Sequence, residues 1–275
     1  RMPACVVVFP DCFTALGGNQ YVNSSAIGDY ADYLVRELVP FVDAELDTGG
    51  ERDRRGCFGK SSGGYGAIIH GMRHARTWGA VASHSGDAHF ETCYQPMWPE
   101  ALTHLGGYRK PAPKAGPVNV EKRAAGLDEG LDDGRVARFL DHFWQKERPG
   151  GDEIATLMMV AMAATYDPDP EAPNGFRLPC NLETGELIPA RWRAWRRHDP
   201  VNLVRRHARS LKSLKGLWID CGWRDQYHIH FGSRILSREL GRAGVKHTYE
   251  EFDGTHSGID HRMDRSLPFL ARALR

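Results

Sequence analysis

The chain has 275 residues, and its 36 Lys and Arg nearly balance its 35 Asp and Glu, which leaves a formal net charge of +1. This balance gives no global basic field for nucleic acid or for an acidic membrane surface. Hydrophobic residues make up 41% and charged residues 26%, which is near the average for folded proteins and excludes a disordered chain. No apolar stretch approaches the roughly 20 residues of a membrane-spanning helix.

The six cysteines are scattered along the chain, and no C-x-x-C pair occurs. This spacing argues against a zinc ribbon and against a thioredoxin-type redox site, so we expect neither a metal nor a cofactor. Isolated cysteines suit a reducing compartment, and the sequence therefore favours a cytoplasmic location.

Strand patterns alternate with helix patterns near both ends of the chain. Residues 4–10 (ACVVVFP) have the uniformly apolar pattern of a buried strand, and residues 29–46 form a helical pattern that Pro40 should kink or break. Further strands are predicted at 56–59, 78–83, 216–220 and 246–252, and further helices at 66–73, 231–243 and 267–274. This alternation predicts an α/β fold, with a mostly parallel central sheet flanked by helices.

Residues 87–200 interrupt that alternation. Short helices are predicted at 135–144 and 154–166, and Asp199-Pro200 should open another helix with the aspartate as its cap. We expect 87–200 to be a helical lid or cap inserted into a single domain that spans residues 1–275. A plain helical excursion that takes no part in the site is the alternative.

The clearest local motif is Gly59-Lys60-Ser61-Ser62-Gly63, which matches G-x-S-x-G and lies between a predicted strand and a predicted helix. Glycines on both sides let strand and helix approach closely, so Ser61 would project from a tight turn as a nucleophile. The Ser62 N–H, at the start of the helix, would stabilise the oxyanion. The motif also resembles the end of a phosphate-binding loop, but Arg54 stands where that loop needs glycine.

A serine nucleophile needs a base and an acid, which in this type of hydrolase follow in the order Ser, acid, His. Asp225 follows the strand at 216–220 and is the predicted acid, and His256 follows the last strand and is the predicted base. Asp87, which follows the strand at 78–83, is the alternative acid. Asp220 lies within its strand, and Asp253 lies too close to His256 in sequence to orient it.

Two other patterns have simpler interpretations. His228 and His230 are two residues apart, so a helix would not place them on one face, and we do not expect a metal site. Residues 191–197 (RWRAWRR) resemble a nucleic-acid stripe, but in a chain of net charge +1 they predict a solvated helix face with buried tryptophans.

Several segments resemble the esterase D and enterochelin-esterase-like group of α/β-hydrolases, which includes S-formylglutathione hydrolases, feruloyl esterases and mycolyltransferases. The resemblance covers roughly residues 4–90 and 199–275 and implies the same catalytic set: Ser61, Asp225 and His256. The matching stretches are residues 9–11 (FPD), 20–24 (QYVNS), 29–43, 59–66 (GKSSGGYG), 83–87 (SHSGD) and 253–257 (DGTHS).

In one respect the chain departs from that group. In the group's fold a strand that comes earlier in the chain lies in the sheet between the strand at 4–10 and the strand before Ser61, and its loop supplies the first oxyanion N–H. This chain has only one predicted strand before residue 56, so that central strand is missing. Losing a central strand would expose unpaired backbone groups on two ladders. We therefore expect the chain to be incomplete, with N-terminal strands supplied by an upstream segment or a second chain. Cys12 or Phe13 could otherwise serve as the donor.

These patterns predict a serine carboxylesterase that hydrolyses an ester or thioester through an acyl-enzyme on Ser61. The alternatives are an acyltransferase on the same fold and a catalytically silent binding protein. We expect a small-molecule ester as partner, with no nucleic acid and no membrane, and a homo-oligomer is left open. Phe90, Tyr94 and Trp98, together with the Met-rich helix 154–166, are the candidate walls of the substrate pocket.

Overall fold

Four parallel strands form the main sheet of the described residues, in the order β3-β4-β5-β6. The computed structural model describes residues 2–110 and 132–275. All four strands lie where the sequence predicts them, so the predicted α/β fold with a parallel sheet is confirmed. They are β3 (Gly56–Lys60), β4 (Ala80–His84), β5 (Gly216–Gly222) and β6 (Thr248–Phe252).

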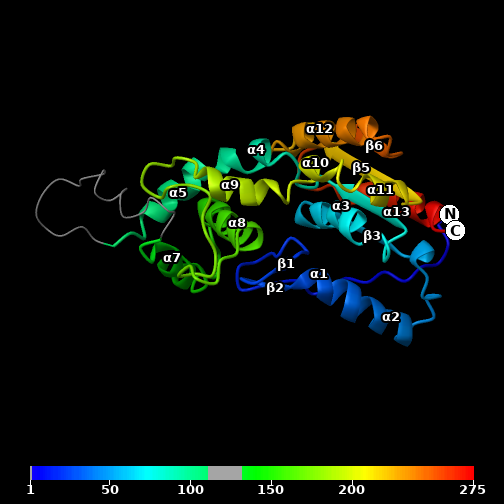
Figure 1. Ribbon diagram of the computed structural model, residues 1–275, viewed down its shortest axis with the longest axis horizontal. Coiled ribbons are helices and arrows are strands. Elements are labelled where there is room, and N and C mark those ends of the chain that lie inside the picture. Colours follow the sequence, from blue (N-terminus) through cyan, green and yellow to red (C-terminus); the bar gives the residue numbers. More distant parts are fainter. Residues whose placement is uncertain (1, 111–131) are drawn as a thin grey trace, which may run out of the picture.

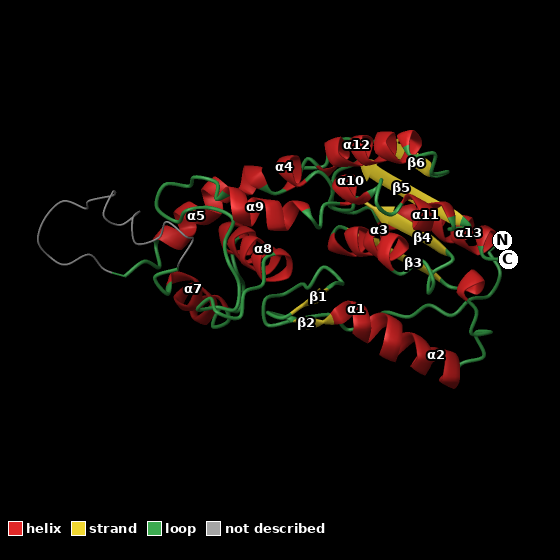
Figure 2. Ribbon diagram, in the orientation of Figure 1, coloured by secondary structure: helices red, strands yellow, loops and turns green. Residues whose placement is uncertain are grey.

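Alternating side chains give the sheet two apolar faces, and helices cover both. Val81 of β4 joins the main hydrophobic core together with α3 (Ser62–Arg73) and α12 (Ile229–Arg242). Ala82, the next residue, faces the opposite side and packs with α13 (Met263–Ala273). The sheet is therefore a buried layer between helices (Figure 2).

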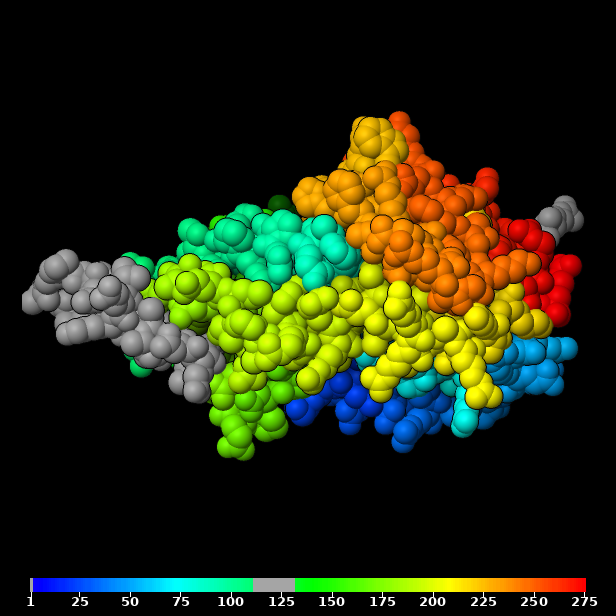
Figure 3. Space-filling model, turned by 45° about the horizontal axis from the view of Figure 1, so that its top comes forward, coloured from blue at the N-terminus to red at the C-terminus, as the bar shows by residue number. Residues whose placement is uncertain are grey.

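The described part of residues 87–200 is helical and adds no strand to the sheet. Most of its helices gather at the end of the molecule that lies away from both termini (Figure 1). The short α4 lies against α12, as the space-filling view also shows (Figure 3). Residues 111–131 lie outside the described residues, and the role of a lid stays a prediction. The helices are α4 (Phe90–Cys93), α5 (Trp98–Gly106), α7 (Arg135–Phe143), α8 (Gly151–Tyr166) and α9 (Pro189–Arg196).

Short elements complete the described fold. The predicted cap is confirmed, because the Asp199 side chain accepts a hydrogen bond of 3.0 Å from the Val201 N–H at the start of α10 (Pro200–Leu203). Other short elements are the two-stranded ribbon β1 (Asn23–Ser24) and β2 (Gly28–Asp29), the helix α11 (Ala208–Lys212), and the 3₁₀ turns η2 (Arg52–Arg54), η3 (Gln95–Met97) and η4 (Asp260–Arg262).

The predicted helix over 29–46 forms, but Pro40 does not break it. The segment runs through α1 (Tyr30–Asp32), a π-helix η1 (Tyr33–Leu38) and α2 (Val39–Glu45). A proline removes one backbone donor and clashes with the carbonyl four residues earlier in a regular α-helix. The wider π turns lie directly before Pro40, so the chain accommodates the ring there without ending the helix.

The predicted strand at 4–10 is absent, which corrects the expectation. The described residues of this segment form no ladder, and Val6, Val7 and Val8 are each at least 41% exposed, while Phe9 is 83% exposed. Within the described residues β3 pairs with β4 alone, so β3 is an edge strand of the sheet. An apolar run becomes a strand only where a partner strand satisfies its backbone groups, and this segment has none there.

Candidate active site

The predicted catalytic residues converge at one edge of the sheet. Ser61 directly follows β3, Asp87 follows β4, Asp225 follows β5 and His256 follows β6. Because the strands are parallel, their carboxyl ends meet at the same edge. Four polar side chains that are far apart in the sequence are thereby brought to one end of the sheet.

Ser61 occupies a strained turn between β3 and α3. Its φ of +57° and ψ of −124° are rare for a residue that carries a side chain. Its N–H donates to the His84 carbonyl at 2.9 Å, which fixes the turn to β4. A Cβ atom on Gly59 would lie 2.5 Å from the backbone of Gly63, so glycine is required for this close approach. The geometry is that of a nucleophile elbow.

Ser62 is the first residue of α3, a helix of 12 residues, so its N–H belongs to the group that has no partner within the helix. The N-terminal end of a helix carries partial positive charge, which suits the oxyanion role predicted for this N–H. Phe13, named as a substitute donor, donates its N–H to the Asp11 carboxylate at 3.0 Å and is 68% exposed. Cys12 accepts the Asn19 side-chain amide on its carbonyl.

Asp225 and His256 form a buried hydrogen-bonded pair, with 2.8 Å between the carboxylate Oδ2 and Nδ1 of the ring. Oδ1 of Asp225 accepts the Tyr227 N–H at 2.9 Å. Burial alone would raise the pKa of Asp225, but the hydrogen bonds from His256 and Tyr227 outweigh it and hold the pKa below its ordinary value. The carboxylate is therefore ionised at neutral pH and directs Nε2 of His256 away from itself.

Two neighbours of His256 were not found from the sequence. Gln226 accepts the His256 N–H on its side-chain oxygen at 3.0 Å, and the Tyr227 ring lies edge-on to the imidazole with ring centroids 4.8 Å apart. Both residues directly follow Asp225, so nearness to the predicted acid was the available signal. They hold the histidine loop against the acid loop.

The alternative acids have other partners. Asp87 makes no hydrogen bond to His256 among the described residues; its Oδ2 accepts from Tyr94 at 2.8 Å and from Gln20 at 3.1 Å. Asp220 is fully buried within β5 and belongs to a separate network with His84. Asp253 is solvent-exposed and pairs with Arg224 at 2.7 Å. The geometry therefore favours Asp225 as the partner of His256.

Ser61 and His256 line one cavity of about 120 Å³. No hydrogen bond joins them among the described residues, which is common in unliganded enzymes, where catalytic hydrogen bonds tighten on substrate binding. The other lining residues are Asp87, Cys93, Tyr94, Met97, Met158, Tyr227 and Ile229.

Of the three predicted pocket walls, only Tyr94 lines this cavity. Phe90 is fully buried and packs against Tyr94 and Tyr166, with ring centroids 4.6 Å and 5.0 Å away. Trp98 packs edge-on to two tryptophans of α9. Both residues belong to the aromatic core and not to the pocket, which corrects the prediction. The Met-rich helix does reach the cavity, through Met158.

The residues with simpler interpretations lie elsewhere. In the stripe 191–197, Trp192 and Trp195 are buried, whereas Arg193 and Arg196 are exposed, as predicted for a solvated helix face. His230 packs against Phe231 with ring centroids 4.1 Å apart. Residues 2–110 and 132–275 contain no group of three metal-ligating side chains, and they contain no helix long and apolar enough to cross a membrane.

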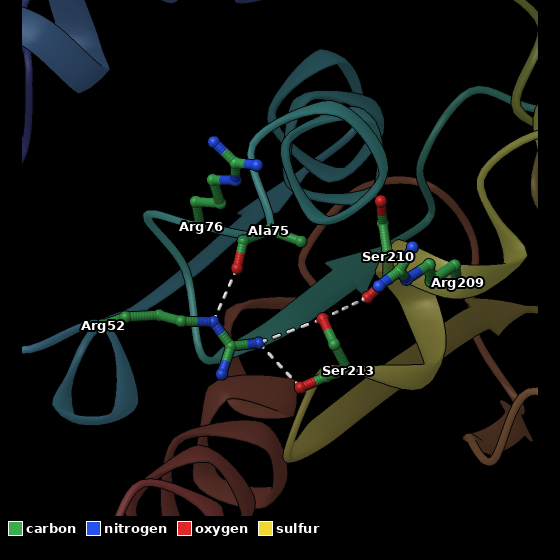
Figure 4. A pocket seen from close by; sticks show the side chains of 6 residues that line it. All are labelled: Arg52, Ala75, Arg76, Arg209, Ser210 and Ser213. Atoms are coloured by element: carbon green, nitrogen blue, oxygen red, sulfur yellow. Dashed lines mark hydrogen bonds between the residues drawn. The ribbon is translucent and has the colours of Figure 1, made fainter.

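A larger cavity of about 560 Å³ lies at the opposite end of the strands. Its lining residues precede β3, β4 and β5, whereas Ser61 and its partners follow them. Figure 4 shows the Arg52 guanidinium donating to the carbonyls of Ala75 and Ser213. These hydrogen bonds connect the three segments that lead into β3, β4 and β5. This cavity contains no residue of the catalytic set, so the smaller cavity is the candidate active site.

Comparison with known proteins agrees with this geometry. Residues 19–264 match the esterase family model, described as "Putative esterase". Among solved structures, a ferulic acid esterase is 16% identical, with a TM-score of 0.51. The match covers 95% of this chain and 67% of the ferulic acid esterase. MPT51 of Mycobacterium tuberculosis is also 16% identical, with a TM-score of 0.50 and coverage of 94% and 74%. An S-formylglutathione hydrolase of Agrobacterium tumefaciens is 14% identical, with a TM-score of 0.49 and coverage of 94% and 64%.

At these identities the solved structures establish the fold alone, and the chain spans about two thirds of the length of the ferulic acid esterase. No curated protein matches the sequence. The family match covers most of the chain, and it agrees with the parallel sheet and with the serine at the elbow. The chain belongs to the esterase family and is a hydrolase.

Proposed function

We propose that this protein is a serine carboxylesterase that cleaves a small ester or thioester through an acyl-enzyme on Ser61. One observation carries the proposal: the serine of a strained elbow and the histidine of a buried Asp–His pair line the same cavity. The cavity is small and mostly apolar, which suits a small-molecule substrate.

In the acylation step, Oγ of Ser61 attacks the carbonyl carbon while Nε2 of His256 takes the hydroxyl proton. The C–O bond (or C–S bond) to the leaving group then breaks, and His256 passes the proton to the departing alcohol or thiol. Asp225 stays ionised and accepts the hydrogen bond from Nδ1 of His256, so it holds the ring in one tautomer and stabilises the imidazolium. General-base help of this kind contributes about 10²–10⁴-fold.

The Ser62 N–H stabilises the negative charge that develops on the carbonyl oxygen, and one such donor is worth roughly 10²–10³-fold. In deacylation, His256 takes a proton from water, the hydroxide adds to the acyl carbon, and the bond to Ser61 breaks with return of the proton to Oγ. The products are a carboxylic acid and the free enzyme.

The test is covalent labelling with a fluorophosphonate, followed by intact-mass analysis and peptide mapping. We expect one adduct, located on Ser61, and none in the Ser61→Ala variant. Absence of any adduct on folded protein would contradict the proposal and favour a silent binding protein. Product analysis with an added alcohol would show transesterification in place of hydrolysis if the protein is an acyltransferase.

A further inference from the structure

The cavity beside Ser61 is lined by a carboxyl group, that of Asp87, as well as by methionines. Asp87 lines the cavity and is only 6% exposed, and its Oδ2 accepts hydrogen bonds from the Tyr94 hydroxyl and the Gln20 amide. Tyr94 and Gln20 are themselves at most 2% exposed. Two segments far apart in the sequence, one with Gln20 and one with Asp87 and Tyr94, thus hold one carboxyl group in a fixed orientation at the active-site cavity.

Asp87 differs from three aspartates that are more deeply buried than it is. Asp199, Asp220 and Asp225 are at most 2% exposed, and each uses both carboxylate oxygens as acceptors. Within the described residues both hydrogen bonds to the Asp87 carboxyl group go to Oδ2, and Oδ1 accepts none. Because Asp87 lines the cavity, this free oxygen is available to a hydrogen-bond donor on a bound molecule.

Burial raises the pKa of Asp87, although the hydrogen bonds from Tyr94 and Gln20 and the nearby His256 oppose this effect. A carboxylate that is costly to bury gains from each additional donor. The cavity walls nearby are apolar, namely Cys93, Met97, Met158 and Ile229, and about 120 Å³ admits only a few heavy atoms. The complementary group is therefore short, apolar along most of its length and a hydrogen-bond donor at its end.

Building on the proposed function, we propose that Asp87 is a specificity-determining residue that accepts a hydrogen bond from a hydroxyl or ammonium group on a short acyl chain. The acyl chain is the part that stays bonded to Ser61 in the intermediate, so it is the part that we place in the cavity beside Ser61. Tyr94 and Gln20 act as positioning residues, because they hold the Asp87 carboxyl with Oδ1 free.

The test compares three 4-nitrophenyl esters of equal acyl length: butanoate, 3-hydroxypropanoate and 3-aminopropanoate. We expect the wild-type protein to prefer one polar ester over butanoate in kcat/KM. In Asp87→Asn the ratio of polar ester to butanoate should fall about tenfold, the effect of one lost hydrogen bond to a charged group. Taking each ratio across the two proteins cancels the intrinsic reactivity of the esters.

A wild-type preference for the aminopropanoate would assign a cation to the site, and a preference for the hydroxypropanoate would assign a neutral hydroxyl. Asp253→Asn is the matched control, since Asp253 is exposed and outside the cavity; its ratios should equal those of the wild type. Equal ratios in the wild type and Asp87→Asn would overturn the inference. Fluorophosphonate labelling of Ser61 in both proteins separates that result from failure of the proposed function, which would remove the inference as well.

Discussion

The described residues contain two serine–histidine–aspartate arrangements, and the better hydrogen-bonded one is not the candidate active site. The inner triad consists of Ser266, His84 and Asp220. Ser266 Oγ lies 2.8 Å from His84 Nε2, and His84 Nδ1 lies 2.7 Å from Asp220 Oδ1. All three residues are at most 3% exposed. Asp220 also accepts hydrogen bonds from Trp218 and Arg262, which makes the group part of a buried structural network.

The outer triad, Ser61, Asp225 and His256, lacks the direct serine–histidine hydrogen bond but has the features that chemistry needs. Ser61 lies on a strained turn at the start of α3, and the cavity is lined by Ser61 and His256 and by none of the inner triad. Ser266 lies within α13, is fully buried and does not line the cavity. Access, elbow geometry and oxyanion donors, more than hydrogen-bond distances, therefore distinguish an active site from a buried network.

The largest effect should come from replacing each serine in turn. Ser61→Ala removes the nucleophile, so ester turnover should fall on the order of 10⁴-fold or more with the fold unchanged. Ser266→Ala leaves His84 Nε2 without its partner, which should cost about 1–3 kcal/mol in the free energy of unfolding while turnover per folded molecule is kept. Turnover and urea denaturation measure the two effects, and the reverse pattern would exchange the roles of the triads.

Replacing Asp225 should lower turnover, whereas replacing Asp220 should lower the free energy of unfolding. Asp225→Asn removes the charge that supports the His256 cation, and turnover should fall about 10³–10⁴-fold. Asp220→Asn removes the carboxylate that pairs with the buried Arg262, so the free energy of unfolding should fall by about 3 kcal/mol. Full turnover in Asp225→Asn would contradict the assignment of the acid and would return Asp87 to consideration.

The outer triad is predictable from the sequence because each of its members follows a predicted strand. Parallel strands bring their carboxyl ends together, so chain position alone places Ser61, Asp225 and His256 at one edge. The inner triad has no such signal. Ser266 and His84 meet only because α13 packs on the face of the sheet that β4 presents to it. Contacts of this kind depend on tertiary packing, which a local pattern does not encode.

The failed predictions have the same origin. Phe90, Tyr94 and Trp98 are all buried aromatics near the insertion's start, and only packing decides that Tyr94 alone faces the cavity. The apolar run at 4–10 has a good strand composition, but a strand also requires a neighbour. The composition of a segment indicates which secondary structure it forms when it is buried. It does not indicate whether another element covers the segment.

Asp225 and Asp87 should change the free energy of unfolding with pH in opposite directions. The pKa of Asp225 is lowered in the fold, so its stabilising contribution is full above its ordinary value of about 3.9 and is lost as the pH falls through the lowered pKa. Burial raises the pKa of Asp87, so the stability linked to that group falls as the pH rises from about 3.9 through the raised pKa. Urea denaturation between about pH 3 and 7 should show a weaker acid-induced loss in Asp225→Asn than in the wild type. In Asp87→Asn the decline with rising pH should disappear, and identical curves for the two variants would contradict both assignments.

The smallest expected effect concerns Gln226, whose side-chain oxygen accepts the His256 N–H. The side chain is exposed, so this hydrogen bond is worth about 0.5–1 kcal/mol and Gln226→Ala should lower kcat about two- to fivefold. The loss should appear in kcat more than in KM, since Gln226 orients the base and does not line the cavity. Gln226→Glu keeps an acceptor at the same position and should restore most of the rate. A loss as large as that of Asp225→Asn would mean that the histidine loop depends on Gln226 for its position, and the hydrogen bond between Asp225 and His256 would then be insufficient to hold the base in place.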